Sequence, residues 1–354
     1  MPKPLAAIFV ALLLFLLVEA ALQLRSHLRF GQSVFNQTKG DSPYLFDKVV
    51  GVTLLRPSHI FGGSEQVIAS NSVGLRSPEI TEIKPGSMIR IVVLGASTVM
   101  GAYAVKNDLT IPALLQQELE AKLGRSRVEV INAGIVGLGI SQQQRLFERL
   151  LVRFSPDLTI VYSGFNDFAD YCREEVESRQ WQPKPLARVK LPMWLLSVEL
   201  LSKNTVSIRS RPQGLRSLVD AEKLDLAPYR SRVRDLISAL KASGTHVLIA
   251  RNARSYRPEQ TMAEQLELST TARFYNPCFD VGGLHRLYYR HNGAIEEEAK
   301  QLGVEVLPLD QVIPGGRKYF VDASHFSELG ERLVARWLAN RVEPWLKERE
   351  NVAK

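Results

Sequence analysis

The hydrophobic pattern begins with one long apolar run at the N-terminus, residues 5–24, broken mainly by Glu19. About 20 apolar residues are what an α-helix needs to cross a bilayer, and Glu19 lies toward one end of the run. We therefore expect residues 1–25 to form a single-pass membrane anchor or a signal peptide. As an anchor, this helix would attach the chain to the membrane.

The sequence after the apolar run favours the anchor over the signal. A cleaved signal needs a small-x-small site, which residues 18–21 (Val-Glu-Ala-Ala) match poorly. Lys3 lies on one side of the run and Arg25 and Arg29 on the other, so basic residues leave the orientation open. Because signal-like N-termini generally export the domain behind them, we expect the catalytic domain outside the cytoplasm, with cleavage and secretion as the second choice.

Residues 26–88 are turn-rich and show no long helical period. Short apolar runs at residues 45–55 and 65–73, bounded by Gly, Pro or Asn, predict strands. We expect this lead-in segment to pack on the domain after it.

From residue 89 the pattern becomes strand, turn and helix, repeated. The predicted strands cover residues 89–94, 128–131, 158–162, 246–250 and 304–309. The predicted helices cover residues 110–124, 141–154, 229–242, 284–302 and 328–347. Strands of β-branched residues that alternate with helices predict a parallel sheet covered on both faces, and so an α/β fold. We expect one domain over residues 89–350.

An insert interrupts the alternation at about residues 179–218. Between residues 181 and 216 it holds seven Lys and Arg residues against one acid, Glu199, around a central apolar stretch. Such a segment can form a lid, lie on a membrane surface or bind an acidic polymer. An ordinary surface excursion explains the same composition equally well.

Composition narrows the function classes. The 354 residues are 45% hydrophobic, enough for one large core, and their formal net charge of +8 comes without a long basic block. No nucleic-acid-binding motif accompanies the charge, so we expect no nucleic-acid partner. The two cysteines, Cys172 and Cys278, are too few for a disulfide scaffold or a zinc ribbon; they either form one bridge in an exported domain or stay separate buried thiols.

Candidate chemistry lies directly after the predicted strands, where parallel sheets bind their ligands. After the first strand, Ser97 on a Gly-rich turn can present a nucleophilic hydroxyl beside backbone N–H groups. After the second, Gly137 lets a backbone N–H approach a reacting oxygen. After the third, the amide of Asn166 can donate to the same oxyanion, although Asn in this position also makes Asx-turns and helix caps.

After the fifth strand come Asp322 and His325, which we place at the start of the final helix. Their spacing of three can put both on one side, so that the carboxylate orients the imidazole while the other ring nitrogen faces Ser97. Each of these signals is common by itself. Their conjunction supplies a nucleophile, a base, an acid and oxyanion donors in order, which predicts a serine hydrolase.

Two other interpretations fit less well. Gly134, Gly137 and Gly139 could form a dinucleotide loop with Asp157 as the ribose acid, but their spacing reverses the usual fingerprint and comes after the second strand. The Gly-x-Ser-x-Gly elbow of α/β-hydrolases is absent around Ser97.

Ser97, Gly137, Asn166 and His325 resemble the four signature positions of the SGNH hydrolases, the GDSL-type esterases and lipases, with Asp322 three residues before the histidine as in that family. The resemblance covers roughly residues 90–339. One departure is that the family's Gly-Asp-Ser is Gly-Ala-Ser here, at residues 95–97. Because that acid has no catalytic role, we expect activity to survive.

The resemblance implies a flavodoxin-like, three-layer α/β/α fold with a five-stranded parallel sheet. It also implies no metal or organic cofactor, and cleavage of an acyl ester through an acyl-serine intermediate. With an exported domain, we expect the substrate to be an acylated glycan or lipid of the envelope or the extracellular space. The alternatives are an O-acyltransferase that modifies a polysaccharide with the same residues, and a non-catalytic envelope scaffold on the same fold.

Overall fold

The computed structural model describes residues 3–30, 43–86, 88–123, 127–163, 165–172, 195–198, 200 and 217–352. The predicted insert therefore lies outside the described residues except for its few residues between 195 and 200 and its C-terminal end.

A five-stranded, all-parallel sheet forms the centre of the domain, in the order β6-β5-β7-β8-β9. The strands are β5 (Ile89–Gly95), β6 (Val128–Gly134), β7 (Leu158–Tyr162), β8 (His246–Ala250) and β9 (Glu305–Leu307). In chain order of these strands the arrangement is 2-1-3-4-5, that of the flavodoxin-like doubly wound sheet. The predicted α/β class and five-stranded parallel sheet are confirmed.

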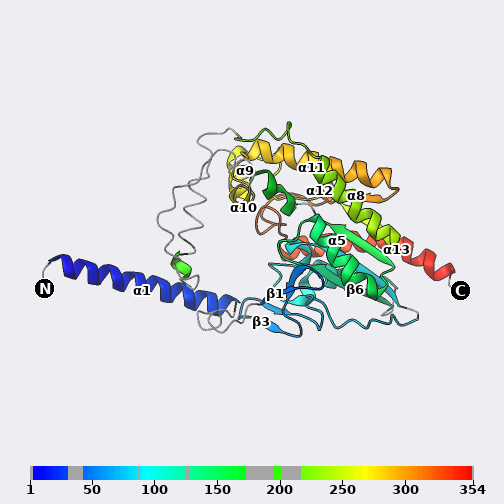
Figure 1. The fold of residues 1–354 in the computed structure, drawn as a ribbon, viewed down its shortest axis with the longest axis horizontal. Coiled ribbons are helices and arrows are strands. Elements are labelled where there is room, and N and C mark those ends of the chain that lie inside the picture. The colour runs from blue at the N-terminus through cyan, green and yellow to red at the C-terminus, as the bar shows by residue number, and fades with distance from the viewer. Residues whose placement is uncertain are drawn as a thin grey trace.

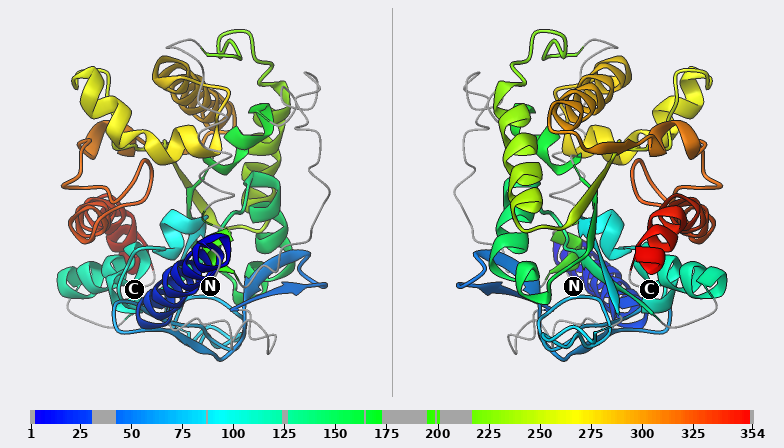
Figure 2. Two further views of the ribbon diagram at one scale, coloured as in Figure 1. Left: turned by 90° about the vertical axis from the view of Figure 1, so that its left-hand side faces the viewer. Right: turned by 90° about the vertical axis from the view of Figure 1, so that its right-hand side faces the viewer.

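Helices cover both faces of the sheet, giving three layers (Figures 1 and 2). On one face lie α5 (Ile140–Arg149), α8 (Ala227–Ala242) and α11 (Val281–Gln301); on the other lie α4 (Ile111–Leu123) and α13 (Glu328–Val352). Alternate residues of β5 divide between them: Val92 and Leu94 pack in the first core, and Ile91 and Val93 in the second. These five helices match the predicted ones to within a few residues at most ends.

Shorter helices, which the hydrophobic pattern did not predict, connect these elements. They are α3 (Ser97–Met100), α9 (Met262–Leu268), α10 (Thr270–Tyr275), α12 (Leu309–Val312) and the 3₁₀ turns Asn107–Leu109, Leu151–Phe154 and Phe165–Phe168.

The lead-in segment forms two hairpins, β1 (Tyr44–Asp47) with β2 (Val52–Leu55) and β3 (Ile60–Gly62) with β4 (Val67–Ala69). The single strand predicted over residues 45–55 is therefore wrong. The Asp47 side chain accepts the N–H groups of Val49 and Val50 at 2.8 and 2.9 Å, which closes a turn inside that apolar run. Of the strand predicted over residues 65–73, only Val67–Ala69 is a strand.

The N-terminal helix α1 (Lys3–Phe30) extends away from the domain, with most of its large apolar side chains exposed (Figure 1). Its apolar part, Pro4–Leu28, is long enough to cross a membrane, as an anchor or a signal sequence does. Its C-terminal end is tied to the second hairpin, since Ser64 donates its N–H and its hydroxyl to the Leu28 carbonyl. The Glu19 carboxylate accepts the backbone N–H groups of Leu196 and Ser197, both at 2.9 Å, so part of the insert contacts this helix.

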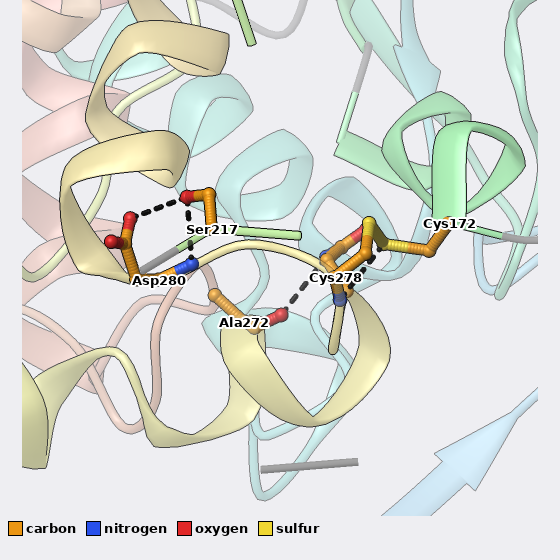
Figure 3. The surroundings of a disulfide bond; sticks show 6 residues. Cys172, Ser217, Ala272, Cys278 and Asp280 are labelled. Atoms are coloured by element: carbon orange, nitrogen blue, oxygen red, sulfur yellow. Dashed lines mark hydrogen bonds between the residues drawn. A yellow bond between two sulfur atoms is a disulfide. The ribbon is translucent and has the colours of Figure 1, made fainter. Parts of the chain in front are cut away.

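Cys172 and Cys278 form a disulfide, which settles the choice that the sequence left open (Figure 3). Their Cα atoms lie 5.4 Å apart across 106 residues of sequence. Beside the bridge, the Ser217 hydroxyl donates to Asp280 at 2.6 Å, and Asp280 caps the N-terminus of α11. The chain is thus attached to the same place shortly before the insert, by Cys172, and at the C-terminal end of the insert, by Ser217.

Candidate active site

Ser97 is the first residue of α3, immediately beyond the carboxyl end of β5. The glycines around it allow close packing. A Cβ on Gly95 would lie 2.5 Å from the Tyr162 carbonyl oxygen, and one on Gly134 would lie 2.0 Å from the Met100 nitrogen. Gly134 therefore seats α3 against β6, which explains this glycine without a dinucleotide.

Asp322 and His325 lie between β9 and α13, before the helix begins at Glu328. The pair therefore lies in the loop that opens this helix, and the helical spacing of three that we expected to bring the two side chains together is absent. Asp322 Oδ1 accepts the backbone N–H groups of Ser324 and His325, both at 2.9 Å, in an Asx-turn. This turn, instead of a helical face, brings the carboxylate beside the imidazole.

The three predicted residues form one continuous chain of contacts. Asp322 Oδ2 lies 2.8 Å from His325 Nδ1, and His325 Nε2 lies 2.8 Å from Ser97 Oγ. A carboxylate can only accept, so Nδ1 carries the imidazole proton and Nε2 is free to accept the Ser97 hydroxyl proton. The side chains of His325 and Asp322 are only 18% and 10% exposed, so water screens the pair weakly.

The environment keeps Asp322 ionised. Burial raises the pKa of its carboxyl, but hydrogen bonds from the His325 ring and from two backbone N–H groups lower it by more. The pKa therefore lies below the ordinary value. An ionised carboxylate in this position stabilises an imidazolium that forms beside it.

Gly137 and Asn166 lie on the loops after β6 and β7, the two strands that flank β5. Gly95 is in register with both Gly134 and Tyr162, so the three strands end at the same level. Gly137 has a φ of +79° and is exposed, with open space where a side chain would be.

Asn166 contacts the loop that carries Gly137. Its Nδ2 donates to the Leu138 carbonyl at 3.0 Å, which uses one of the two amide hydrogens. Asn166 thus neither caps a helix nor closes an Asx-turn with this bond. The structure places the two candidate donors on touching loops beside the end of β5.

Sequence reasoning assigned no role to Asp167, although the residue comes directly after Asn166. Asp167 is buried and accepts the N–H of Ile140 at 3.2 Å, at the start of α5, while Arg232 lies 3.5 Å away. Burial raises the pKa of this carboxyl to about 6, against the opposing effects of Arg232 and the Ile140 N–H. The Asp167 side chain thus fixes the end of the Gly137 loop where α5 begins, at Ile140.

Sequence reasoning also missed Tyr103. Its ring meets the His325 imidazole edge-on with centroids 5.2 Å apart, and its hydroxyl donates to Asp322 Oδ2 over a long 3.4 Å. No motif surrounds this tyrosine, so only the fold could place it here.

Within the part of the chain that the structure describes, no three His, Cys, Asp or Glu side chains are grouped as metal ligands would be. We therefore assign no metal-binding or cofactor-binding residues.

The segment that carries the candidate residues is similar to known proteins. A family model of GDSL-like lipases and acylhydrolases matches residues 91–338, a range that includes every candidate residue. The search of curated proteins gave no match. Similar solved structures include a lipase/acylhydrolase from Enterococcus faecalis, with 17% identity, a TM-score of 0.43 and coverage of 73% of this chain and 96% of that one. They also include a catalytic mutant of an acetylxylan esterase from Geobacillus stearothermophilus, with 14% identity, a TM-score of 0.45 and coverage of 73% and 96%.

The match with the family model extends over more than half of the chain and over the sheet, except for the first two residues of β5, together with the candidate residues. The chain therefore belongs to the family of GDSL-like lipases and acylhydrolases and is an enzyme that hydrolyses ester bonds.

Proposed function

We propose that the protein is a serine esterase with Ser97 as nucleophile, His325 as general base and acid, and Asp322 as the group that orients and stabilises the imidazole. The proposal rests above all on the unbroken chain of two 2.8 Å contacts that joins the three side chains. Two of its members lie 228 residues apart in the sequence.

The reaction begins as His325 Nε2 takes the Ser97 proton and Oγ attacks the ester carbonyl carbon. The carbonyl π electrons move to the oxygen and a tetrahedral intermediate forms. His325 then gives its proton to the leaving alcohol oxygen as the C–O bond breaks, which leaves an acyl-serine. Water attacks the acyl carbon with the same base, and the carboxylic acid leaves as Ser97 regains its proton.

The oxyanion is held by the backbone N–H groups of Ser97 and Gly137 and by the Asn166 amide. The level ends of β5, β6 and β7 and the contact between Asn166 and the Leu138 carbonyl support this assignment. Donors fixed by the backbone in this way stabilise the charge without reorganising during the reaction.

The substrate is an acyl ester on a glycan or lipid of the envelope or outside the cell, and removal of O-acetyl groups is the reaction that we favour. Two observations support a catalytic domain outside the cytoplasm, held by an uncleaved N-terminal helix. The helix α1 has the length and composition of a membrane span. The Cys172–Cys278 disulfide is typical of an oxidising compartment.

A fluorophosphonate probe tests the nucleophile directly. Full-length wild-type protein in detergent should be labelled and should hydrolyse p-nitrophenyl acetate, whereas Ser97→Ala should do neither and should melt at the same temperature by circular dichroism. Ser231→Ala, at an exposed position on α8, is the matched control and should behave as wild type. Labelling of Ser97→Ala would refute the assignment.

The same experiment separates the alternatives. A folded wild-type protein that resists the probe would favour a non-catalytic scaffold. Transfer of the acyl group to a glycan acceptor, at the expense of free acid, would identify an O-acyltransferase.

A further inference from the structure

A cavity lies apart from the triad, on the α8 and α11 side of the domain. Its volume is about 740 Å³, and Ser97, Asp322 and His325 are not among its lining residues. The N-terminal end of α8, the middle of α11, the segment after β8 and the helix α12 enclose it. Its walls carry five arginines: Arg230, Arg251, Arg254, Arg257 and Arg290.

Two of these arginines are neutralised by carboxylates. Arg230 pairs with Glu297 at 2.6 Å, and Arg251 pairs with Glu296 at 2.8 Å and also with Asp310. Their charges are largely satisfied within the protein.

The other three have only neutral partners among the described residues. Arg254 donates to the Tyr256 carbonyl and to His285, Arg257 donates to the Ile313 carbonyl, and Arg290 donates to main-chain carbonyls at residues 221 and 224. No carboxylate of the described chain lies within ion-pair distance of these three guanidinium groups. Three guanidinium groups of the cavity thus have no direct ion pair among the described residues, and the five arginines of the lining face four carboxylates, those of Asp225, Glu296, Glu297 and Asp310.

Arg254 is the most enclosed of them, with 8% of its surface exposed and its guanidinium 4.7 Å from the centre of the Tyr288 ring. Its partner His285 is neutral at physiological pH, because burial and the nearby Arg254 lower the pKa of the imidazole to about 4. His285 Nε2 donates to Gln265 at 2.8 Å, so Nδ1 accepts from Arg254. His285 therefore leaves the positive charge of Arg254 uncompensated.

We propose that this cavity binds a sugar-sized ligand that carries an acidic group, either a phosphate or a carboxylate. Guanidinium groups form paired hydrogen bonds with both of these anions. The volume is in the range of small-molecule sites and exceeds what a lone phosphate needs. Glu296 and Gln311 on the same walls can hydrogen-bond to sugar hydroxyls.

The cavity is coupled to the catalytic segment through the backbone. The Ser255 N–H, between Arg254 and Tyr256, donates to the Ala323 carbonyl at 3.0 Å, between Asp322 and Ser324. An acidic unit bound in the cavity thus lies on the same edge of the sheet as the triad. In a polymer, such a unit would hold the chain beside the site where an acyl group is removed.

Calorimetric titration of the full-length protein in detergent tests the proposal with four probes. Glucose 6-phosphate or glucuronate should bind about tenfold or more tightly than glucose, since each charged hydrogen bond lost costs about that factor. Whichever of the two acidic sugars binds more tightly identifies the acidic group. Absence of binding by both, or an affinity for inorganic phosphate equal to that for the acidic sugars, would overturn the proposal.

Gly293 offers a variant that fills the cavity without disturbing the fold. It lies on α11 in the cavity wall, with no atom within 4 Å of an added Cβ, and its replacement favours the helix. Gly293→Glu should weaken binding of the acidic sugar about tenfold or more by occupying space and opposing the anion. Gln301→Glu, with the same charge change at the exposed end of α11, should not.

Arg254→Gln should weaken binding as Gly293→Glu does. If this buried variant does not fold, the comparison of Gly293→Glu with its control Gln301→Glu decides the outcome. Fluorophosphonate labelling of Ser97 should be unchanged in Gly293→Glu, so failure of the cavity and failure of the esterase assignment are distinguishable. Undiminished affinity in Gly293→Glu, or an equal loss in Gln301→Glu, would contradict the proposal.

Discussion

Replacing Asp322 by Asn tests how the triad sets the protonation of His325. Asp322 Oδ1 accepts two backbone N–H groups at 2.9 Å, so the oxygen of an asparagine must occupy that position. Its NH₂ group then faces His325 Nδ1, which lies 2.8 Å from the present Oδ2. Two donors cannot face each other, so the imidazole must move its proton to Nε2, toward Ser97.

An imidazole with its proton on Nε2 cannot accept the Ser97 proton. We expect kcat to fall by roughly 10³–10⁴, because the side chain keeps its shape but fixes the wrong tautomer. This loss corresponds to about 4–5.5 kcal/mol of transition-state stabilisation. The fold should persist, since the asparagine oxygen keeps both backbone hydrogen bonds of the Asx-turn.

Initial rates on p-nitrophenyl acetate, with thermal melts by circular dichroism, measure both effects. Asp235→Asn, which removes an exposed carboxylate on α8, is the control and should retain wild-type rates. A folded Asp322→Asn enzyme within about tenfold of wild type would refute the reasoning, because orientation by the carboxylate would then contribute little.

Three further predictions concern Asp167, Tyr103 and the disulfide. Burial raises the pKa of Asp167 from an ordinary 3.8 to about 6, so the free energy of unfolding of the wild-type protein should fall by about 3 kcal/mol as pH rises from about 4 to 6. Asp167→Asn should remove this part of the pH dependence. Denaturant midpoints across this range measure it, and parallel profiles would contradict it. Tyr103→Phe keeps the ring against His325 and removes the 3.4 Å hydrogen bond to Asp322, so kcat/KM should fall by less than about fivefold; a larger fall would give the hydroxyl a direct role. Cys172→Ser should cost about 2–5 kcal/mol of stability, seen as a lower melting temperature than that of the oxidised protein.

The sheet was predictable because its strands are short apolar runs and its helices are amphipathic. Parallel strands that end level bring residues two to four positions beyond them to one edge, as for Ser97, Gly137 and Asn166. Only the order of residues along the chain was needed for this step, and the catalytic roles of these residues stay a prediction.

Local side-chain hydrogen bonds were not predictable from hydrophobic periodicity. The turn between β1 and β2 is hidden by Val49 and Val50, whose apolar character suggests a strand, while the Asp47 carboxylate closes the turn. Asp322 likewise closes an Asx-turn that precedes α13, where spacing alone suggested a helical face. Both errors arose because an Asp side chain can replace a backbone acceptor.

Contacts between segments that are distant in the sequence could not be predicted either. Tyr103 meets Asp322 across 219 residues, and nothing around either residue marks the encounter. Whether Cys172 and Cys278 form a disulfide depends on whether the fold brings them together, and the amino-acid composition could not decide this.

Ala96 shows which part of the nucleophile block the chemistry requires. It stands before the first turn of α3 with no side-chain capping bond, and its carbonyl accepts the Met100 N–H at 3.0 Å, a contact that any residue can make. Gly95, in contrast, has no space for a Cβ, and Ser97 is the residue of this triplet whose side chain contacts His325. The departure from Gly-Asp-Ser thus lies at a residue whose side chain makes no capping bond. The missing acid therefore takes no contact away from the Asp322–His325–Ser97 chain through which Ser97 is proposed to act.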